Sequence, residues 1–64
     1  MTLIDLLKVT DLDTRVAVEI PGERFPIAGK CQEVLDELTP EMLESNIVDV
    51  YLSIVYSAIY ITIE

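Results

Sequence analysis

The side chains able to do chemistry in this chain are mostly carboxylates, and five of them cluster in one short stretch of sequence. Aligned on helical turns, they would form a negative strip on the solvent side, although repulsion between acids four residues apart is unfavourable. Such a strip can imitate a nucleic-acid backbone and occupy the basic channel of another protein. A solvated helix face is the plainer interpretation, and both stay open. This acidic strip consists of Glu33, Asp36, Glu37, Glu41 and Glu44.

Three tyrosines near the end of the chain form a second candidate group. Tyr51 and Tyr60 fall on the same face of an expected hairpin, and Tyr56 falls at its turn. Tyrosine is enriched in protein interfaces because it offers a large contact area together with a hydroxyl group. A cross-strand pair that only stabilises the sheet is the alternative. The apolar turn around Val55 favours contact with another molecule, so we predict a partner-binding role for these tyrosines.

The sequence contains no motif for catalysis or metal binding. It has no histidine and a single cysteine, Cys31, which we expect to be a small core residue rather than a nucleophile. Zinc-ligand spacings and glycine-rich phosphate loops are absent, and Asp11 with Asp13 lacks the further ligands and the glycine of a calcium loop. We therefore predict that the protein is not an enzyme and uses no cofactor or metal.

Charge is distributed unevenly along the chain. The 64 residues carry twelve acids and four bases, for a formal charge of -8, and all the bases lie within residues 1–30. Direct binding to nucleic acid requires a basic surface for the phosphates, so we do not expect it. The negative field instead suits a partner protein with a basic surface, or it only keeps a small hydrophobic protein in solution.

The last part of the chain, from Val50 to Ile63, contains no charged residue. As a helix it would rise only ~21 Å, short of a ~30 Å hydrocarbon core, and its β-branched residues favour strands, so we predict a hairpin and no membrane span. For the aliphatic faces of both strands to meet one core, the numbers of paired residues must sum to an odd value. An even loop follows, with four residues at 55–58 favoured over two. The face expected to meet the core comprises Val48, Val50, Leu52 and Ile54.

Hydrophobic periodicity predicts short elements elsewhere, and together they make a single α+β domain over residues 1–64. Two hairpins would form a four-stranded antiparallel sheet with short helices packed on one face. Asp5 interrupts the apolar start of the chain, unlike a secretion signal, so we expect the cytoplasm of a bacterial host cell. The predicted elements are a helix at 3–8, strands at 15–20 and 25–27 around a Pro21-Gly22 turn, a helix at 31–38, a helical turn from Pro40 that ends at a left-handed Asn46, and the hairpin.

Four parts of the sequence carry a family resemblance: Met1–Leu7, Thr14–Val18, Gly29 and Ile59–Ile63. Together they span nearly the whole chain and resemble a set of small acidic proteins of Firmicutes and of their phages and mobile elements. The turn at Val55–Ala58 departs from the polar, acidic turn of those relatives. The resemblance implies no activity, but small acidic phage proteins often bind and block a host protein, including defence nucleases.

Two functional hypotheses follow. The first is a phage-type inhibitor that binds a host defence protein, of the CRISPR kind, through the acidic strip and the tyrosines. The second is a structural or regulatory protein that forms a homodimer through the C-terminal hairpin, since small domains often gain stability by association.

Overall fold

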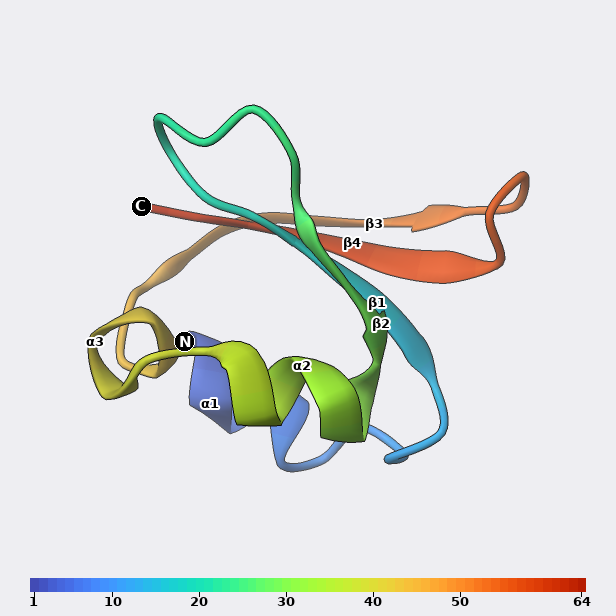
Figure 1. Cartoon of the computed structure of the whole chain (residues 1–64), viewed down its shortest axis with the longest axis horizontal. Helices are drawn as coiled ribbons and strands as arrows, with labels where there is room; N and C mark the ends of the chain where they lie inside the picture. Colours follow the sequence, from blue (N-terminus) through green and yellow to red (C-terminus); the bar gives the residue numbers. More distant parts are fainter.

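The structure, a computed structural model, describes all 64 residues as three short helices and four strands (Figure 1). The α+β class is confirmed, and the three helices lie where the sequence predicts them. The elements in chain order are α1 (Leu3–Leu7), β1 (Arg15–Glu19), β2 (Ile27–Lys30), α2 (Cys31–Glu37), α3 (Pro40–Leu43), β3 (Ile47–Ser53) and β4 (Ala58–Ile63).

The strands form one mixed sheet in the order β2-β1-β4-β3. Each hairpin is antiparallel, but the hairpins meet through β1 and β4, which run parallel with Val16 beside Ile59. The prediction of a purely antiparallel sheet was therefore wrong. The reason lies in the connection, because α2 and α3 carry the chain from the end of β2 to the opposite end of the sheet before β3 begins. Such a crossover makes strands parallel, and the alternation within each strand does not encode it.

All three helices cover the same face of the sheet (Figure 1). Val16 and Val18 of β1 face this helical layer, as predicted, and so do Ile61 and Ile63 of β4. From β3, by contrast, only Ile47 packs against the core, and it is only partly buried. The buried core consists of Leu3, Leu7, Val16, Val18, Cys31, Val34, Leu38, Ile61 and Ile63.

Local signals fix the first hairpin and the helix starts. Gly22 has a φ of 85°, and the N–H of Glu23 donates to the carbonyl of Ile20 at 3.0 Å, as in the predicted type II turn. The second strand begins at Ile27 rather than at residue 25, because Pro26 has no N–H to donate to the ladder. At α3, the hydroxyl of Thr39 accepts the N–H of Met42 at 3.2 Å. This cap confirms the predicted helix start at Pro40.

The second hairpin keeps the predicted parity but not the predicted loop. Tyr51 pairs with Tyr60 and Ser53 with Ala58, so the residue numbers of each pair sum to an odd value. The four loop residues are 54–57 rather than 55–58, and Ser57 closes the turn with a φ of 50°. The register slips between Ile47 and Asp49, where Val48 forms a bulge.

Asn46 does not adopt the predicted left-handed conformation, since Ser57 is the one residue other than glycine with a positive φ. Instead the backbone of Asn46 pairs with Thr2 in an isolated antiparallel bridge. The N–H of Ile47 also donates to the carbonyl of Met1 at 2.9 Å. The N-terminal residues thereby provide hydrogen-bond partners for the backbone that follows α3, and no left-handed residue is needed to end the helix.

Candidate protein-interaction surface

β3 forms one edge of the sheet, and its apolar side chains lie largely in solvent. Leu52 is 74% exposed, and Ile54 and Val55, in the turn that follows, are 93% and 85% exposed. The prediction that Val50, Leu52 and Ile54 face the core was therefore wrong, as it was for Val48, which is also exposed. We call this group the β3 surface; it consists of Val48, Val50, Leu52, Ile54, Val55 and Tyr56.

Val50 and Leu52 of the β3 surface are uncovered on the helical side because the helical layer is too small for the sheet. α1 has five residues, α2 seven and α3 four. At ~1.5 Å per residue these helices rise only ~6–10 Å, whereas the axes of the outer strands of a four-stranded sheet lie ~14 Å apart. α2 packs under β1 and β2, and α1 packs beside α3. The shortness of the predicted helices was thus the feature of the sequence from which incomplete coverage of the sheet could have been predicted.

The backbone of β3 is unpaired along the side that faces away from β4. The N–H of Val50 donates to the carboxylate of Asp49 at 3.0 Å, a local bond made by an N–H that points away from the ladder. Charged residues and bulges obstruct the addition of a further strand at a sheet edge. Here Asp49 and the bulge at Val48 protect only the first part of β3. Residues 50–53 contain neither lysine nor proline.

The helix-free face of the sheet carries the tyrosines. Tyr51 and Tyr60 stack with ring centroids 5.2 Å apart and an interplanar angle of 17°, which confirms the predicted cross-strand pair. The hydroxyl of Tyr51 donates to a carboxylate oxygen of Glu19 at 3.1 Å. Partial burial and this bond to a carboxylate raise the pKa of Tyr51 above its ordinary value. Tyr51 and Tyr60 therefore link three strands, while Tyr56 remains the most exposed of the tyrosines.

A shallow groove lies beside this stack. Its volume is about 170 Å³, its walls include Tyr56 and Tyr60, and Arg15 lines it as well. The floor is low because small residues, among them Ala17 and Ala28, stand side by side on β1 and β2. Sites for small molecules usually enclose ~300–1,000 Å³, so the groove is small for a metabolite or cofactor.

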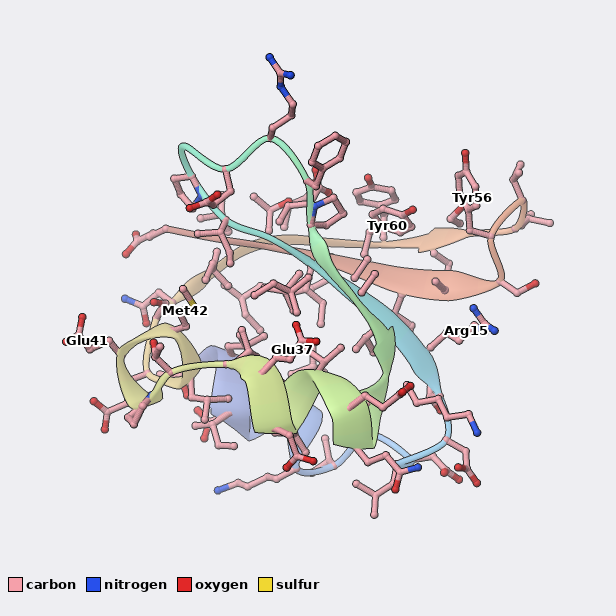
Figure 2. The ribbon with its side chains drawn as sticks, viewed as in Figure 1. Arg15, Glu37, Glu41, Met42, Tyr56 and Tyr60 are labelled. Atoms are coloured by element: carbon pink, nitrogen blue, oxygen red, sulfur yellow. The ribbon has the colours of Figure 1, made fainter.

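The acidic strip lies on the helical layer, away from the tyrosines. Figure 2 shows Glu37 and Glu41 on the helical side and Tyr56 and Tyr60 on the other side of the sheet. Glu33 has a structural role, since its carboxylate accepts the N–H of Lys30 at 2.9 Å and caps α2. The structure therefore does not unite the two predicted halves of the binding site. All five acids, Glu33, Asp36, Glu37, Glu41 and Glu44, are exposed.

Cys31 is buried in the core, as predicted. Its thiol donates to the carbonyl of Leu7 at 3.6 Å, and burial, followed by the charge of Asp11, raises the pKa of the thiol. A raised pKa disfavours the nucleophilic thiolate.

Further groupings of functional side chains are not formed. No three cysteine, aspartate or glutamate side chains converge in a way that could hold a metal ion. None of the helices is both long and apolar enough to cross a membrane. The chain matches no protein-family model, and neither a curated protein nor a solved structure matches it.

Proposed function

We propose that this protein is a protein-binding module that docks onto its partner through the β3 surface. The observation that carries the proposal is the exposed apolar run on an unpaired edge strand. Single exposed aliphatic residues are normal on soluble domains, but a contiguous apolar patch marks a contact site. Six of the eleven large hydrophobic side chains that are exposed belong to the β3 surface.

The chemistry of the β3 surface suits a polypeptide rather than a small molecule. An edge strand offers backbone donors and acceptors to an incoming strand, while alternate side chains supply apolar contacts. Leu52 and Ile54 stand clear of the body of the protein, so a partner can bury them without any rearrangement of the core. At ~25 cal/mol per Å² of apolar surface, burial of several such side chains provides most of the driving force for docking.

The acidic strip supports a secondary role in partner choice. Exposed acids on one layer create a field that speeds encounter with a basic surface, while the apolar contacts hold the complex together. Combined with the resemblance to phage proteins, this makes a host defence protein with a basic nucleic-acid channel the first class of partner to test. In the alternative, mimicry of nucleic acid by the strip alone, the β3 surface has no part in binding.

A pair of matched positions tests the proposal. Leu52 and Phe25 are 74% and 76% exposed; Leu52 lies on the edge strand β3, and Phe25 lies in the loop that precedes β2, the strand at the opposite edge. A photo-reactive phenylalanine analogue is placed at one or the other in the full chain, which is then expressed in bacteria and irradiated. We expect a discrete covalent adduct from position 52 and none from position 25. Equal yields at both positions, or no adduct from either, would contradict docking through the β3 surface.

Charge reversal separates the two modes of binding. If the β3 surface holds a partner with a basic surface, Glu37→Lys with Glu41→Lys slows association and leaves the adduct at position 52 intact. If the strip alone imitates nucleic acid, the same reversal abolishes binding, and Leu52→Asp has no effect on it. Association rates over a range of salt concentrations distinguish these outcomes, because steering by exposed charges is screened by salt.

A further inference from the structure

The outer edge of β3 restricts which strand can pair with it, because only alternate residues turn their backbone N–H and C=O groups outward. In an antiparallel ladder the N–H and C=O of one residue point to the same side, and successive residues alternate. The N–H of Val50 turns away from β4 toward the side chain of Asp49. The backbone groups of Val50 and Leu52 therefore form the outer edge, and those of Tyr51 point to β4. An incoming strand would replace the Asp49 carboxylate as the acceptor of the Val50 N–H.

The regular part of β3 is symmetric about Tyr51. After the bulge, uninterrupted pairing with β4 runs from Asp49 to Ser53, and Tyr51 is the middle residue of this segment. A two-fold axis that passes through Tyr51 would let the whole segment pair with its own copy in antiparallel orientation. Val50 would then form hydrogen-bonded pairs with Leu52 of the other copy, which matches the outward direction of their backbone groups. If the axis passed through Val50 or Leu52 instead, the paired segment would extend into the bulge or into the turn, and fewer residues would pair regularly.

This register also matches side chains. On the helical side it places Val50 against Leu52 of the second copy, so apolar groups meet apolar groups. On the other side the two Tyr51 rings face each other, and Asp49 faces Ser53 rather than a second Asp49. Like charges directly opposite each other are unfavourable in a sheet, and this pairing avoids them.

The distribution of charge favours the same occupant. Residues 50–63 carry no charge, while the acids of α2 and α3 lie on the helical layer. A basic partner would find no acid on the β3 surface after Asp49. In the contact with a second copy of this self-complementary strand, Asp49 faces Ser53 and no other charged residue takes part, while each acidic strip stays on the helical layer of its own copy.

We infer that the partner of the β3 surface is a second copy of the chain, joined edge to edge by antiparallel pairing of the two β3 strands about a two-fold axis at Tyr51. The inference rests on the proposed function, since it names the partner of the same surface. The two four-stranded sheets become one continuous sheet. On the side that carries the helices, Val50 and Leu52 of one copy contact Leu52 and Val50 of the other.

Sedimentation of the full chain over a wide range of concentrations tests the association. We expect reversible passage from 7.2 kDa to twice that mass, with tighter association at higher salt because each chain carries a charge of -8. Leu52→Asp should weaken association at least about tenfold. Phe25→Asp, in the loop that precedes β2, should leave it unchanged. A strict monomer at all concentrations overturns the inference.

Cysteine cross-linking tests the register. Facing residues of a non-hydrogen-bonded pair have Cα atoms ~4.5 Å apart, within the range for a disulfide. Tyr51→Cys should therefore form a dimer on mild oxidation, and Asp49→Cys combined with Ser53→Cys should do so with Tyr51 intact. Wild type should not cross-link, because Cys31 is buried. Ser53→Cys alone should stay monomeric, and its cross-linking as fast as Tyr51→Cys would overturn the register.

These outcomes separate the inference from the proposed function. A monomer that still gives an adduct with another protein from position 52 overturns the homodimer and leaves docking through the β3 surface in place. Absence of both self-association and an adduct overturns the two together.

Discussion

The two edges of the sheet are built in opposite ways. β2 has four residues, follows a proline, ends in Lys30 and runs directly into α2, which packs beneath it. β3 has seven residues, no lysine or proline, and no helix beneath its outer part. Short length, proline, lysine and a covering helix are the devices by which proteins prevent edge pairing. β2 uses all of them, and β3 uses only the bulge and Asp49.

The difference shows that exposure at β3 is a property of one edge and not a general consequence of small size. The same chain closes its other edge with few residues. It therefore has the means to protect a strand, and the open edge is where we place docking. The predictions that follow contrast β3 with the core and with the protected edge at β2.

The largest expected difference is in the free energy of unfolding, between a substitution in the core and one on β3. Leu7→Ala removes a fully buried side chain from the core, and we expect a loss of about 2–5 kcal/mol in the free energy of unfolding. Leu52→Ala removes a side chain that is exposed in the single chain, and we expect a change within about 0.5 kcal/mol. Urea unfolding at low protein concentration measures both. A large loss for Leu52→Ala in dilute solution would mean that β3 packs in the monomer.

The second prediction concerns lysine at the two edges. Leu52→Lys should suppress self-association at least about tenfold, because it adds the charge by which edge strands are normally protected. Ala28→Lys, on the exposed outer face of β2, should leave association unchanged, because that edge takes no part in it. Sedimentation of both variants at equal concentration provides the measurement, and equal suppression would show that association does not depend on the β3 edge.

Much of the fold follows from local sequence. Alternation places Val16 and Val18 in the core, Thr39 and Pro40 start a helix, and the odd sum of paired residues places Tyr51 opposite Tyr60. Each of these features depends on residues close together in the chain. The parallel contact of β1 with β4 depends instead on where the crossover leaves the chain, and periodicity does not contain that information.

The candidate site was harder to predict for a related reason. Alternation marks Val50 and Leu52 as one face of a strand, but it does not say whether anything covers that face. Coverage is set by the summed length of the helices, which is too small here. Spacing predicts the pair of Tyr51 and Tyr60, yet it does not reveal that α2 and this tyrosine stack lie on opposite sides of the sheet.

A third prediction concerns Tyr51, which ties the open edge to the rest of the sheet. Tyr51→Phe keeps the stack on Tyr60 and removes the bond to Glu19, so we expect a loss of stability far smaller than that of Leu7→Ala. The raised pKa gives this contribution a pH dependence. It is fully present below the ordinary value of 10.0 and is lost as the pH rises through the higher folded-state pKa. Unfolding measured across this alkaline range should show a shallower decline for Tyr51→Phe, and identical slopes would contradict the assignment.

The smallest effect is expected at Asp5, in α1 of the helical layer. Its carboxylate accepts the N–H of Thr2 at 3.2 Å, and this bond lowers the pKa of Asp5 below 3.8. A lowered folded-state pKa contributes stability above the ordinary value and loses it as the pH falls through the folded-state pKa. Asp5→Asn should therefore flatten the acid side of the stability profile slightly and leave association unchanged. Altered association in this variant would show that the N-terminal helix takes part in the contact.

Amide hydrogen exchange tests the open edge most directly. The backbone N–H groups of Val50 and Leu52 point away from β4, so in dilute solution they should exchange quickly. As the protein concentration rises, pairing with a second β3 should slow their exchange, while the amides of β2 stay unchanged. Exchange at Val50 and Leu52 that is independent of concentration, or protection that rises equally at both edges, would contradict the account.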